Sequence, residues 1–268
     1  MKKIIKTLLP PIVFDFIKKI YKKKYGWLGE YDSYEEVEKL SKGYNQDNII
    51  NTVKNSLLKV KNNQAVYERD SVIFEKIHYS WALLSGLMYV TLKSHNKLDI
   101  IDFGGSLGST YYQNRVFLDR LEHVSWNIVE QEQFVKVGRE EFEDARLKFY
   151  YSVEEAKQNN KNINVILLSS VLQYISSPYE LLDEMLQHDF KYILFDRTAF
   201  SKNKKRVTLQ VVPPHIYEAS YPCWFFDERE FKQYFEKKNF YIIEEFEALD
   251  GESDSYIFKG FIMEKKDV

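Results

Sequence analysis

The stretch IIDFGGSLGS, residues 100–109, decides the fold. A short apolar run ends at an acidic residue, Asp102, and a glycine pair follows at Gly104 and Gly105. Short apolar runs that stop at glycines are typical of a buried strand that turns sharply into a helix. Such turns are where open α/β sheets bind cofactors, so the residues in the turn indicate which cofactor it fits.

Further apolar runs follow this stretch at intervals that leave room for helices between them. We expect one helix over 179–188, after Pro178, and another over 227–239, before two closing strands at 241–247 and 255–266 that form a hairpin. Strands alternating with helices predict a Rossmann-like α/β fold, with a mostly parallel sheet, helices on both faces and one antiparallel strand. The other predicted strands are 98–103, 126–130, 147–151, 164–170 and 192–196.

The two flanking regions lack this alternation. Up to about residue 97 the apolar spacing is helical, and one run extends from Ser71 to Met88. Residues 199–224 read as a long loop that forms a lid. The sequence therefore predicts an N-terminal helical region over 1–97 and a cofactor-binding domain over 98–268, with the lid at about 199–226.

The composition is that of a soluble globular protein, with 44% hydrophobic and 29% charged residues among 268. The single cysteine, Cys223, excludes an internal disulfide. The five histidines are scattered and no CxxC occurs, so we expect no metal site. A reducing, cytoplasmic setting fits this cysteine usage.

Residues 1–25 hold eight lysines and one acidic residue, Asp15. Pro10, Pro11 and Asp15 interrupt the apolar stretch, which argues against a signal peptide or a membrane span. A basic amphipathic helix here is able to contact the anionic inner face of a membrane, although a solvated helix docked on the domain is the favoured interpretation. Basic charge elsewhere is dispersed, so nucleic acid is not an expected partner.

Two common nucleotide motifs fail at the glycine turn. A dinucleotide fingerprint, GxGxxG, would need glycines where Ser106 and Ser109 stand, and a phosphate-binding P-loop would need a lysine that is absent. What remains is acid-x-Gly-x-Ser-x-Gly, formed by Asp102, Gly104, Ser106 and Gly108. The turn therefore fits neither a nicotinamide dinucleotide nor a nucleoside triphosphate.

This motif resembles the first motif of class I S-adenosylmethionine-dependent methyltransferases. The resemblance implies that the turn passes close to the methionine part of the cofactor and that Asp102 orients that part. Glu130 ends the next strand, where a carboxylate accepts hydrogen bonds from ribose hydroxyls, and Gln131 follows it. The implied cofactor-binding residues of the turn are Gly104, Gly105, Ser106 and Gly108.

The segment SSVLQYISSP, 169–178, resembles the strand end and proline-initiated helix that border the methyl-transfer site of small-molecule methyltransferases. It implies that Ser169 and Ser170 lie beside the cofactor. The sequence departs from the family after the third strand, where an acid commonly holds the adenine amino group. YYSVEEA stands there, which leaves Ser152 or the backbone for that role.

The chain also resembles a narrower group, bacterial methyltransferases associated with surface-polysaccharide biosynthesis. The resemblance implies an O-methyltransferase that acts on a sugar or nucleotide-activated sugar, for example a heptose, and releases S-adenosylhomocysteine. The matching stretches are YERDS (67–71), DFGGSLGSTYYQ (102–113), WNIVEQ (126–131), LLSSVLQYISSP (167–178), FDRT (195–198) and QVVPPHIYEASYPCW (210–224).

Methyl transfer to a hydroxyl needs a base. His215, in the expected lid, is the favoured candidate because imidazole titrates near neutral pH, with Asp196 orienting it or the acceptor. Arg197 suits a phosphate or carboxylate of the acceptor. The alternatives are a structural Asp196–Arg197 salt bridge and a histidine with only a surface role.

Flat aromatic faces suit a sugar or a base, so Tyr174, Tyr217, Tyr221 and Trp224 are the expected substrate-binding residues. Packing within the lid is the alternative for Trp224. Glu68, Arg69 and Asp70 in YERDS either cap the helix expected after them or reach over the cofactor, and capping is favoured.

Two rival functions remain open. One is a cofactor-binding scaffold without catalysis, recruited through the basic N-terminal segment. The other is a nucleotide-dependent oxidoreductase or epimerase, against which the broken GxGxxG and the absence of Tyr-x-x-x-Lys argue.

Overall fold

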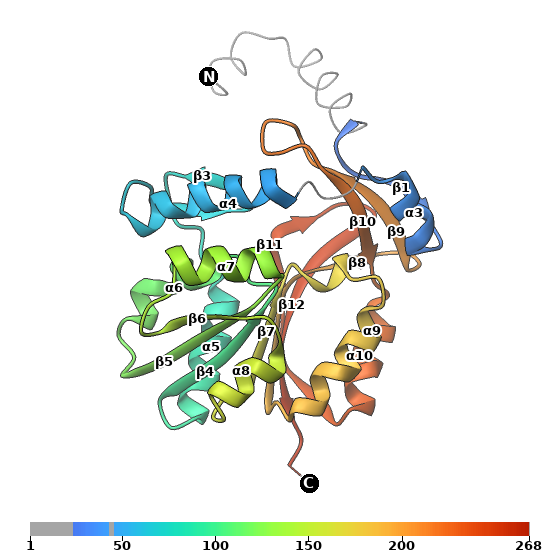
Figure 1. The fold of residues 1–268 in the computed structure, drawn as a ribbon. Helices are drawn as coiled ribbons and strands as arrows, with labels where there is room; N and C mark the ends of the chain where they lie inside the picture. The colour runs from blue at the N-terminus through green and yellow to red at the C-terminus, as the bar shows by residue number, and fades with distance from the viewer. Residues whose placement is uncertain (1–23, 43–45, 268) are drawn as a thin grey trace.

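The computed structural model describes residues 24–42 and 46–267, and its centre is a seven-stranded sheet (Figure 1). Five neighbouring strands of this sheet, β6, β5, β4, β7 and β8, run parallel to one another, and β12 runs antiparallel to both of its neighbours. This confirms the predicted fold class. The order across the sheet is β6 (Leu147–Tyr150), β5 (His123–Val129), β4 (Lys97–Phe103), β7 (Val165–Ser169), β8 (Tyr192–Ser201), β12 (Tyr256–Lys265) and β11 (Phe240–Glu252).

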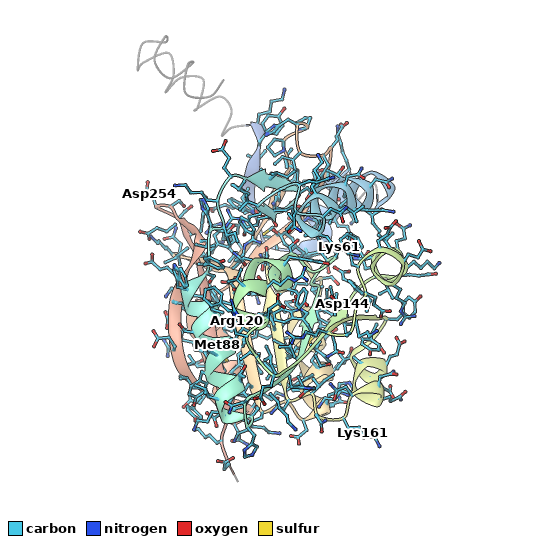
Figure 2. All side chains as sticks on the ribbon, turned by 90° about the vertical axis from the view of Figure 1, so that its left-hand side faces the viewer. Lys61, Met88, Arg120, Asp144, Lys161 and Asp254 are labelled. Atoms are coloured by element: carbon cyan, nitrogen blue, oxygen red, sulfur yellow. The ribbon has the colours of Figure 1, made fainter. Side chains whose placement is uncertain are left out.

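Helices cover both faces of the sheet because its central strands are apolar on both sides. Ile100 and Ile101, adjacent on β4, are fully buried in two different core clusters. Met88 packs against the Ile100 cluster from the side that faces the viewer in Figure 2. That cluster includes side chains from α5 (Trp81–Lys93), α6 (Ser109–Leu118) and α7 (Glu132–Glu141), and the other from α8 (Val153–Asn159), α9 (Pro178–Met185) and α10 (Glu228–Lys237).

Strand order places the ligand crevice. The chain runs outward from β4 through β5 to β6 and then returns to the other side of β4 as β7, so Asp102 pairs with Ile128 on one side and Leu167 on the other. In open α/β sheets the crevice for ligands lies at the carboxyl ends of the strands, where the order reverses. Here that point is the end of β4 and of β7.

The region before β4 is less helical than expected. It contains α3 (Tyr34–Leu40) and α4 (Gln46–Lys61), but also β1 (Gly26–Tyr31) and a hairpin of β2 (Tyr67–Arg69) and β3 (Val72–Phe74). The predicted helical run from Ser71 is wrong up to residue 80. Asp70 and Ser71 both adopt positive φ and form the turn between β2 and β3, so α5 begins only at Trp81. The division of the chain at residue 97 stays a prediction.

The predicted loop over 199–224, and with it the lid at 199–226, is also wrong in part. β8 continues to Ser201, and β9 (Arg206–Val211) pairs with both β1 and β10 (Ser220–Phe225) in a second, antiparallel sheet. β10 is the edge strand of that sheet, a position that tolerates Pro222. Residues 202–205, between β8 and β9, and residues 212–219, between β9 and β10, retain the irregular backbone that was expected of a loop.

Membrane contact through residues 1–25 concerns a segment that lies almost wholly outside the described residues. Within the residues that the structure does describe, no helix is both long and apolar enough to span a bilayer.

Candidate active site

The turn after β4 has the backbone geometry that its glycines predict. Gly104, Ser106 and Gly108 have φ values of 67°, 55° and 105°, in the left-handed region that glycine adopts without strain. The amide of Gly104 donates to the carbonyl of Val129 at 2.9 Å, which joins the turn to the end of β5. Gly108 then occupies the position before α6 and supplies no side-chain cap.

Two glycines in this turn are required by close approach. A Cβ atom on Gly104 would lie 2.4 Å from Cγ2 of Val171, and one on Gly105 would lie 2.5 Å from Cγ of Asp102. Neither distance is compatible with van der Waals radii. The turn therefore needs glycine at both positions to pack against Val171 and Asp102, at the carboxyl ends of β4 and β7.

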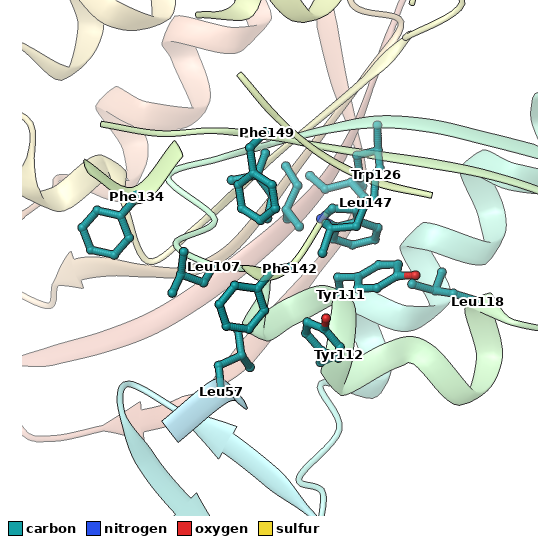
Figure 3. Close-up of a cluster of buried hydrophobic side chains, with 14 of the residues drawn as sticks. Leu57, Leu107, Tyr111, Tyr112, Leu118, Trp126, Phe134, Phe142, Leu147 and Phe149 are labelled. Atoms are coloured by element: carbon teal, nitrogen blue, oxygen red, sulfur yellow. The ribbon is translucent and has the colours of Figure 1, made fainter. Parts of the chain in front are cut away.

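Leu107 anchors the turn from below. It is fully buried, and its side chain lies among Phe134, Phe142 and Phe149 (Figure 3). This contact holds the turn against the apolar core while its neighbours Gly105 and Ser106 remain partly accessible.

Asp102 lies beneath the turn rather than at its surface. Its side chain is fully buried, and Oδ2 accepts a hydrogen bond from Nε1 of Trp126 at 3.0 Å. Burial raises the pKa of Asp102 to about 7, opposed by the Trp126 hydrogen bond and reinforced by the charge of Glu130. The other carboxylate oxygen, Oδ1, is buried without a hydrogen-bond partner. A buried acceptor without a donor is rare, and it marks a place where a bound group or water completes the structure.

Glu130 lies directly beyond β5, on the side of the turn. Its Oε1 accepts from the amide of Ser106 at 3.3 Å, and its Oε2 accepts from the amide of Gln131 at 2.7 Å. Burial raises the pKa of Glu130, and these two amides oppose that shift. Each carboxylate oxygen keeps a second lone pair, so the two ribose hydroxyls of an adenosine have acceptors here. The structure thus brings Ser106, Glu130 and Gln131 together.

Ser152 caps α8. Its hydroxyl oxygen accepts from the amide of Glu155 at 3.1 Å, which satisfies one of the free amides of the first helical turn. The residue follows β6 and so lies at the same edge of the sheet as Glu130. Its hydroxyl proton remains available, and its role toward adenine stays a prediction.

Asp196 lies at the far side of the crevice, on β8 beside β7. It is 4% exposed, and its carboxylate accepts from the hydroxyls of Ser169 at 3.3 Å and Ser80 at 3.5 Å. Burial raises the pKa of Asp196 to about 6, opposed by Arg197 and reinforced by Asp250. The carboxyl is therefore ionised at neutral pH while its pKa is high enough to accept a proton.

Ser170 and Gln173 lie beside Asp196 and Arg197, at the end of β7. Ser170 has a φ of 55°, and its amide donates to the carbonyl of Asp196 at 3.0 Å. Gln173 is fully buried, and its amide donates to the carbonyl of Arg197 at 3.1 Å and to the Ser170 hydroxyl at 3.3 Å. Its Oε1 atom has no partner. Sequence reasoning did not single out Gln173, although it lies within the quoted segment 169–178.

Arg197 makes ion pairs other than the Asp196 pair that was weighed as its structural alternative. Its guanidinium lies between Asp70 and Asp250: Nη2 donates to Asp70 at 2.6 Å, and Nε donates to Asp250 at 2.7 Å. Burial alone would lower the pKa of Arg197, but the two carboxylates raise it above its ordinary range. Two acidic neighbours leave this side chain poorly placed to attract an anionic acceptor.

Three of the four predicted aromatic residues come together. The rings of Tyr174 and Tyr221 meet edge to face with centroids 5.2 Å apart, and Tyr217 and Tyr221 share a side-chain hydrogen bond. Trp224 instead packs inward. It stacks on Tyr34 at 6.2 Å and donates its indole N–H to the carbonyl of Ile175 at 3.1 Å, as the packing alternative required.

His215 does not join Asp196. It lies exposed in the turn between β9 and β10, and its ring makes no hydrogen bond to any residue that the structure describes. Both oxygens of Asp196 are bonded to serines instead. The expectation that Asp196 orients His215 is therefore not met, and a direct role of His215 stays a prediction.

The predicted capping role of YERDS is wrong. α5 begins after Ser80, far along the chain from these residues. Glu68 instead accepts from the hydroxyl of Ser109, the first residue of α6, at 2.7 Å, and Asp70 binds Arg197. The alternative, that these residues reach over the cofactor, stays a prediction.

No group of three or more His, Cys, Asp or Glu side chains could hold a metal ion within residues 24–42 and 46–267.

Comparison with solved structures places this arrangement among known folds. The N-terminal domain of EvdMO1, solved with S-adenosylhomocysteine and D-fucose, aligns with a TM-score of 0.50 over 75% of this chain and 90% of its own, at 12% identity. The fold is that of the class I methyltransferases.

Two further matches have lower scores. A 1,6-didemethyltoxoflavin-N1-methyltransferase from Burkholderia thailandensis gives a TM-score of 0.48 at 11% identity, covering 84% of this chain and 92% of that one. A methyltransferase from Clostridium acetobutylicum gives 0.46 at 8% identity, covering 71% and 93%. No family model and no curated protein matches the sequence.

Proposed function

We propose that the protein binds S-adenosylmethionine at the turn after β4 and transfers its methyl group to a hydroxyl of a sugar or sugar derivative. The observation that carries the proposal is the buried, partnerless oxygen of Asp102 beneath a turn that is packed so closely at Gly104 and Gly105 that only glycine fits. Glu130 supplies ribose acceptors at the same edge. These residues fit the methionine and ribose parts of the cofactor.

Each residue of the turn has a separate part in this proposal. The amides of the turn and the N-terminus of α6 favour the carboxylate of the methionine part. Asp102, through Oδ1, accepts from a donor bound above Gly105, directly or through water. Glu130 accepts from the ribose hydroxyls, and Ser152 lies where the adenine amino group is expected.

When bound, the cofactor supplies a methyl group on a sulfonium, which is already a strong electrophile. Asp196 would accept the proton of the acceptor hydroxyl, because its buried carboxyl has a raised pKa, and the cofactor would supply the methyl group and leave as S-adenosylhomocysteine. Ser169 and Ser80 hold that carboxylate in one orientation. Alignment of the acceptor supplies most of the remaining acceleration.

Tyr174, Tyr217 and Tyr221 support a sugar-like acceptor, because they offer ring faces and hydroxyls together. The EvdMO1 domain, which shares the fold, was solved with D-fucose beside S-adenosylhomocysteine. We place the reaction in the synthesis of a bacterial surface polysaccharide, in the cytoplasm, with residues 1–25 contacting the inner face of the membrane.

The test is methyl transfer itself. The full chain is incubated with S-adenosylmethionine and two acceptor panels, free monosaccharides and nucleotide-activated sugars, and products are detected by mass spectrometry. The proposal predicts a product heavier by one methylene and an equal amount of S-adenosylhomocysteine, with both formed at least about 100-fold more slowly by Asp196→Asn. Cofactor binding without transfer to any hydroxyl in either panel would favour the scaffold reading.

A further inference from the structure

The β2–β3 hairpin touches the site at two separate points. Glu68 of β2 binds Ser109, which directly follows the glycine turn, and Asp70 of the hairpin turn binds Arg197, next to Asp196. The hairpin therefore spans from the cofactor side of the crevice to the acceptor side. Figure 1 shows it with α4 across the upper edge of the sheet, above α6 and α7.

Glu68 is buried to an extent that is unusual for a glutamate. It is 2% exposed, and each of its oxygens has one partner. Oε1 accepts from the amide of Ser71 at 2.5 Å, within the hairpin, and Oε2 accepts from the hydroxyl of Ser109 at 2.7 Å, on α6. One carboxylate thus closes the hairpin and fastens it to the helix that follows the glycine turn.

The start of α6 needs such a partner. Its N-terminal residue follows Gly108, which has no side chain to cap the helix. A negative charge near a helix N-terminus is stabilising, and Glu68 brings one from a distant part of the sequence. The orientation of the glycine turn relative to α6 therefore depends on a residue of the hairpin.

We propose that Glu68 is a positioning residue for cofactor binding, which holds the β2–β3 hairpin on the glycine turn through Ser109. The proposal rests on the proposed function and deepens it, because it assigns a part in cofactor retention to a segment outside the Rossmann-like core. Glu68 acts through Ser109 and the turn, without touching the reacting atoms.

The charge of Glu68 makes this hold dependent on pH. The groups that face its carboxyl are Tyr67, Asp70 and Ser71 on the hairpin, Ser109 on α6 and Arg197 on β8. Burial raises its pKa to about 7, opposed by the hydrogen bonds from Ser109 and Ser71. As the pH falls through that value the carboxylate gains a proton and accepts less well, so the hold on Ser109 weakens.

The experiment is calorimetric titration of the full chain with S-adenosylhomocysteine, for wild type, Glu68→Gln, Ser109→Ala and the double variant. Each single variant should weaken binding by roughly ten-fold, as expected for one charge-assisted hydrogen bond. The double variant should bind no more weakly than the weaker single variant, because both remove the same contact. Between pH 8 and pH 6 the wild-type affinity should fall more than that of Glu68→Gln.

Glu141→Gln is the matched control. Glu141 accepts from Lys54 at 2.6 Å and links α7 to α4, without a bond to the hairpin or to α6 among the residues that the structure describes. It should leave affinity unchanged. Ser109→Ala alone decides the matter if Glu68→Gln does not fold.

Three results would overturn the inference: unchanged affinity in Glu68→Gln or Ser109→Ala, additive losses in the double variant, or equal pH dependence in wild type and Glu68→Gln. A lower melting temperature with unchanged affinity would show that Glu68 is only structural. If wild type itself fails to bind S-adenosylhomocysteine, the proposed function fails, and this inference with it.

Discussion

Trp126 donates its indole N–H to Asp102 across 3.0 Å, and both side chains are fully buried. The bond joins β5 to the end of β4 directly beneath the glycine turn. It stabilises the charged form of a carboxyl that burial disfavours. The carboxyl of Asp102 is thus buried where charge is disfavoured. Its Oδ2 accepts one hydrogen bond, from Trp126, and its Oδ1 has no hydrogen-bond partner.

Asp102→Asn should flatten the dependence of folding stability on pH. The folded-state pKa of Asp102 is raised from 3.8 to about 7, so the folded protein binds this proton more tightly than the unfolded chain does. Stability is therefore lost as the pH rises between those two values, by up to about 4 kcal/mol. Urea unfolding at a series of pH values, for wild type and variant, measures the difference. Parallel profiles would show that Asp102 titrates normally.

Gly104→Ala and Gly251→Ala separate backbone strain from steric overlap. Both glycines have positive φ, 67° and 73°, but a Cβ on Gly104 meets Val171 at 2.4 Å, whereas one on Gly251 meets nothing within 4 Å. Gly251→Ala should cost about 1 kcal/mol from strain alone. Gly104→Ala should cost about 1–3 kcal/mol more, from overlap. Equal losses in urea unfolding would contradict the close approach.

Asp196 and His215 make opposite predictions for catalysis. If Asp196 is the base, the rate of methyl transfer rises with pH through about 6, the pKa of its buried carboxyl, because the base must be unprotonated. Asp196→Asn should reduce the rate at least about 100-fold without weakening S-adenosylhomocysteine binding. His215→Ala should change the rate by less than about three-fold, since its ring is exposed and unbonded. The reverse ranking of these two variants would restore His215 as the base.

Arg197→Lys should destabilise the fold. Arg197 pairs with Asp70 and Asp250 through different nitrogens, and a lysine ammonium cannot reproduce that geometry. We expect a loss of about 2 kcal/mol, measured from the urea midpoint. Arg115→Lys is the control, since Arg115 lies on α6 and makes an exposed ion pair with Asp119 at 3.4 Å. Similar losses in both would mean that the Arg197 pairs have no special weight.

The central sheet could be predicted because its signals are local. Each parallel strand is a short apolar run that ends at an acidic, serine or glycine residue, and periodicity alone separates these runs from the helices between them. For the same reason the positions of Asp102, Gly104 and Glu130 at one edge followed from the sequence.

The second sheet could not be predicted because its signals are weak and its partners distant. β1 contains two glycines with positive φ, and it pairs with β9 across most of the chain. β10 contains Pro222, which argues against a strand unless the strand lies at an edge. The β2–β3 turn at Asp70 and Ser71 lacks the glycine that usually marks a tight hairpin. The spacing of apolar residues after Ser71 therefore led to the prediction of a helix in place of a hairpin.

The sequence also did not predict the partners of Arg197 and Glu68, because those partners are distant in the chain. Their partners Asp70, Asp250 and Ser109 come from separate elements, and an ion pair between distant residues leaves no pattern in one sequence. The exposure of His215 is likewise a property of the folded chain, which the sequence alone does not show.

The most direct test of the central claim is calorimetric titration of wild type and Gly104→Ala with S-adenosylhomocysteine, with NAD as a control ligand. The account predicts micromolar binding to wild type, loss of that binding in Gly104→Ala and no binding of NAD. Failure of wild type to bind S-adenosylhomocysteine, or equal binding by Gly104→Ala, would contradict the assignment of the glycine turn as the cofactor site.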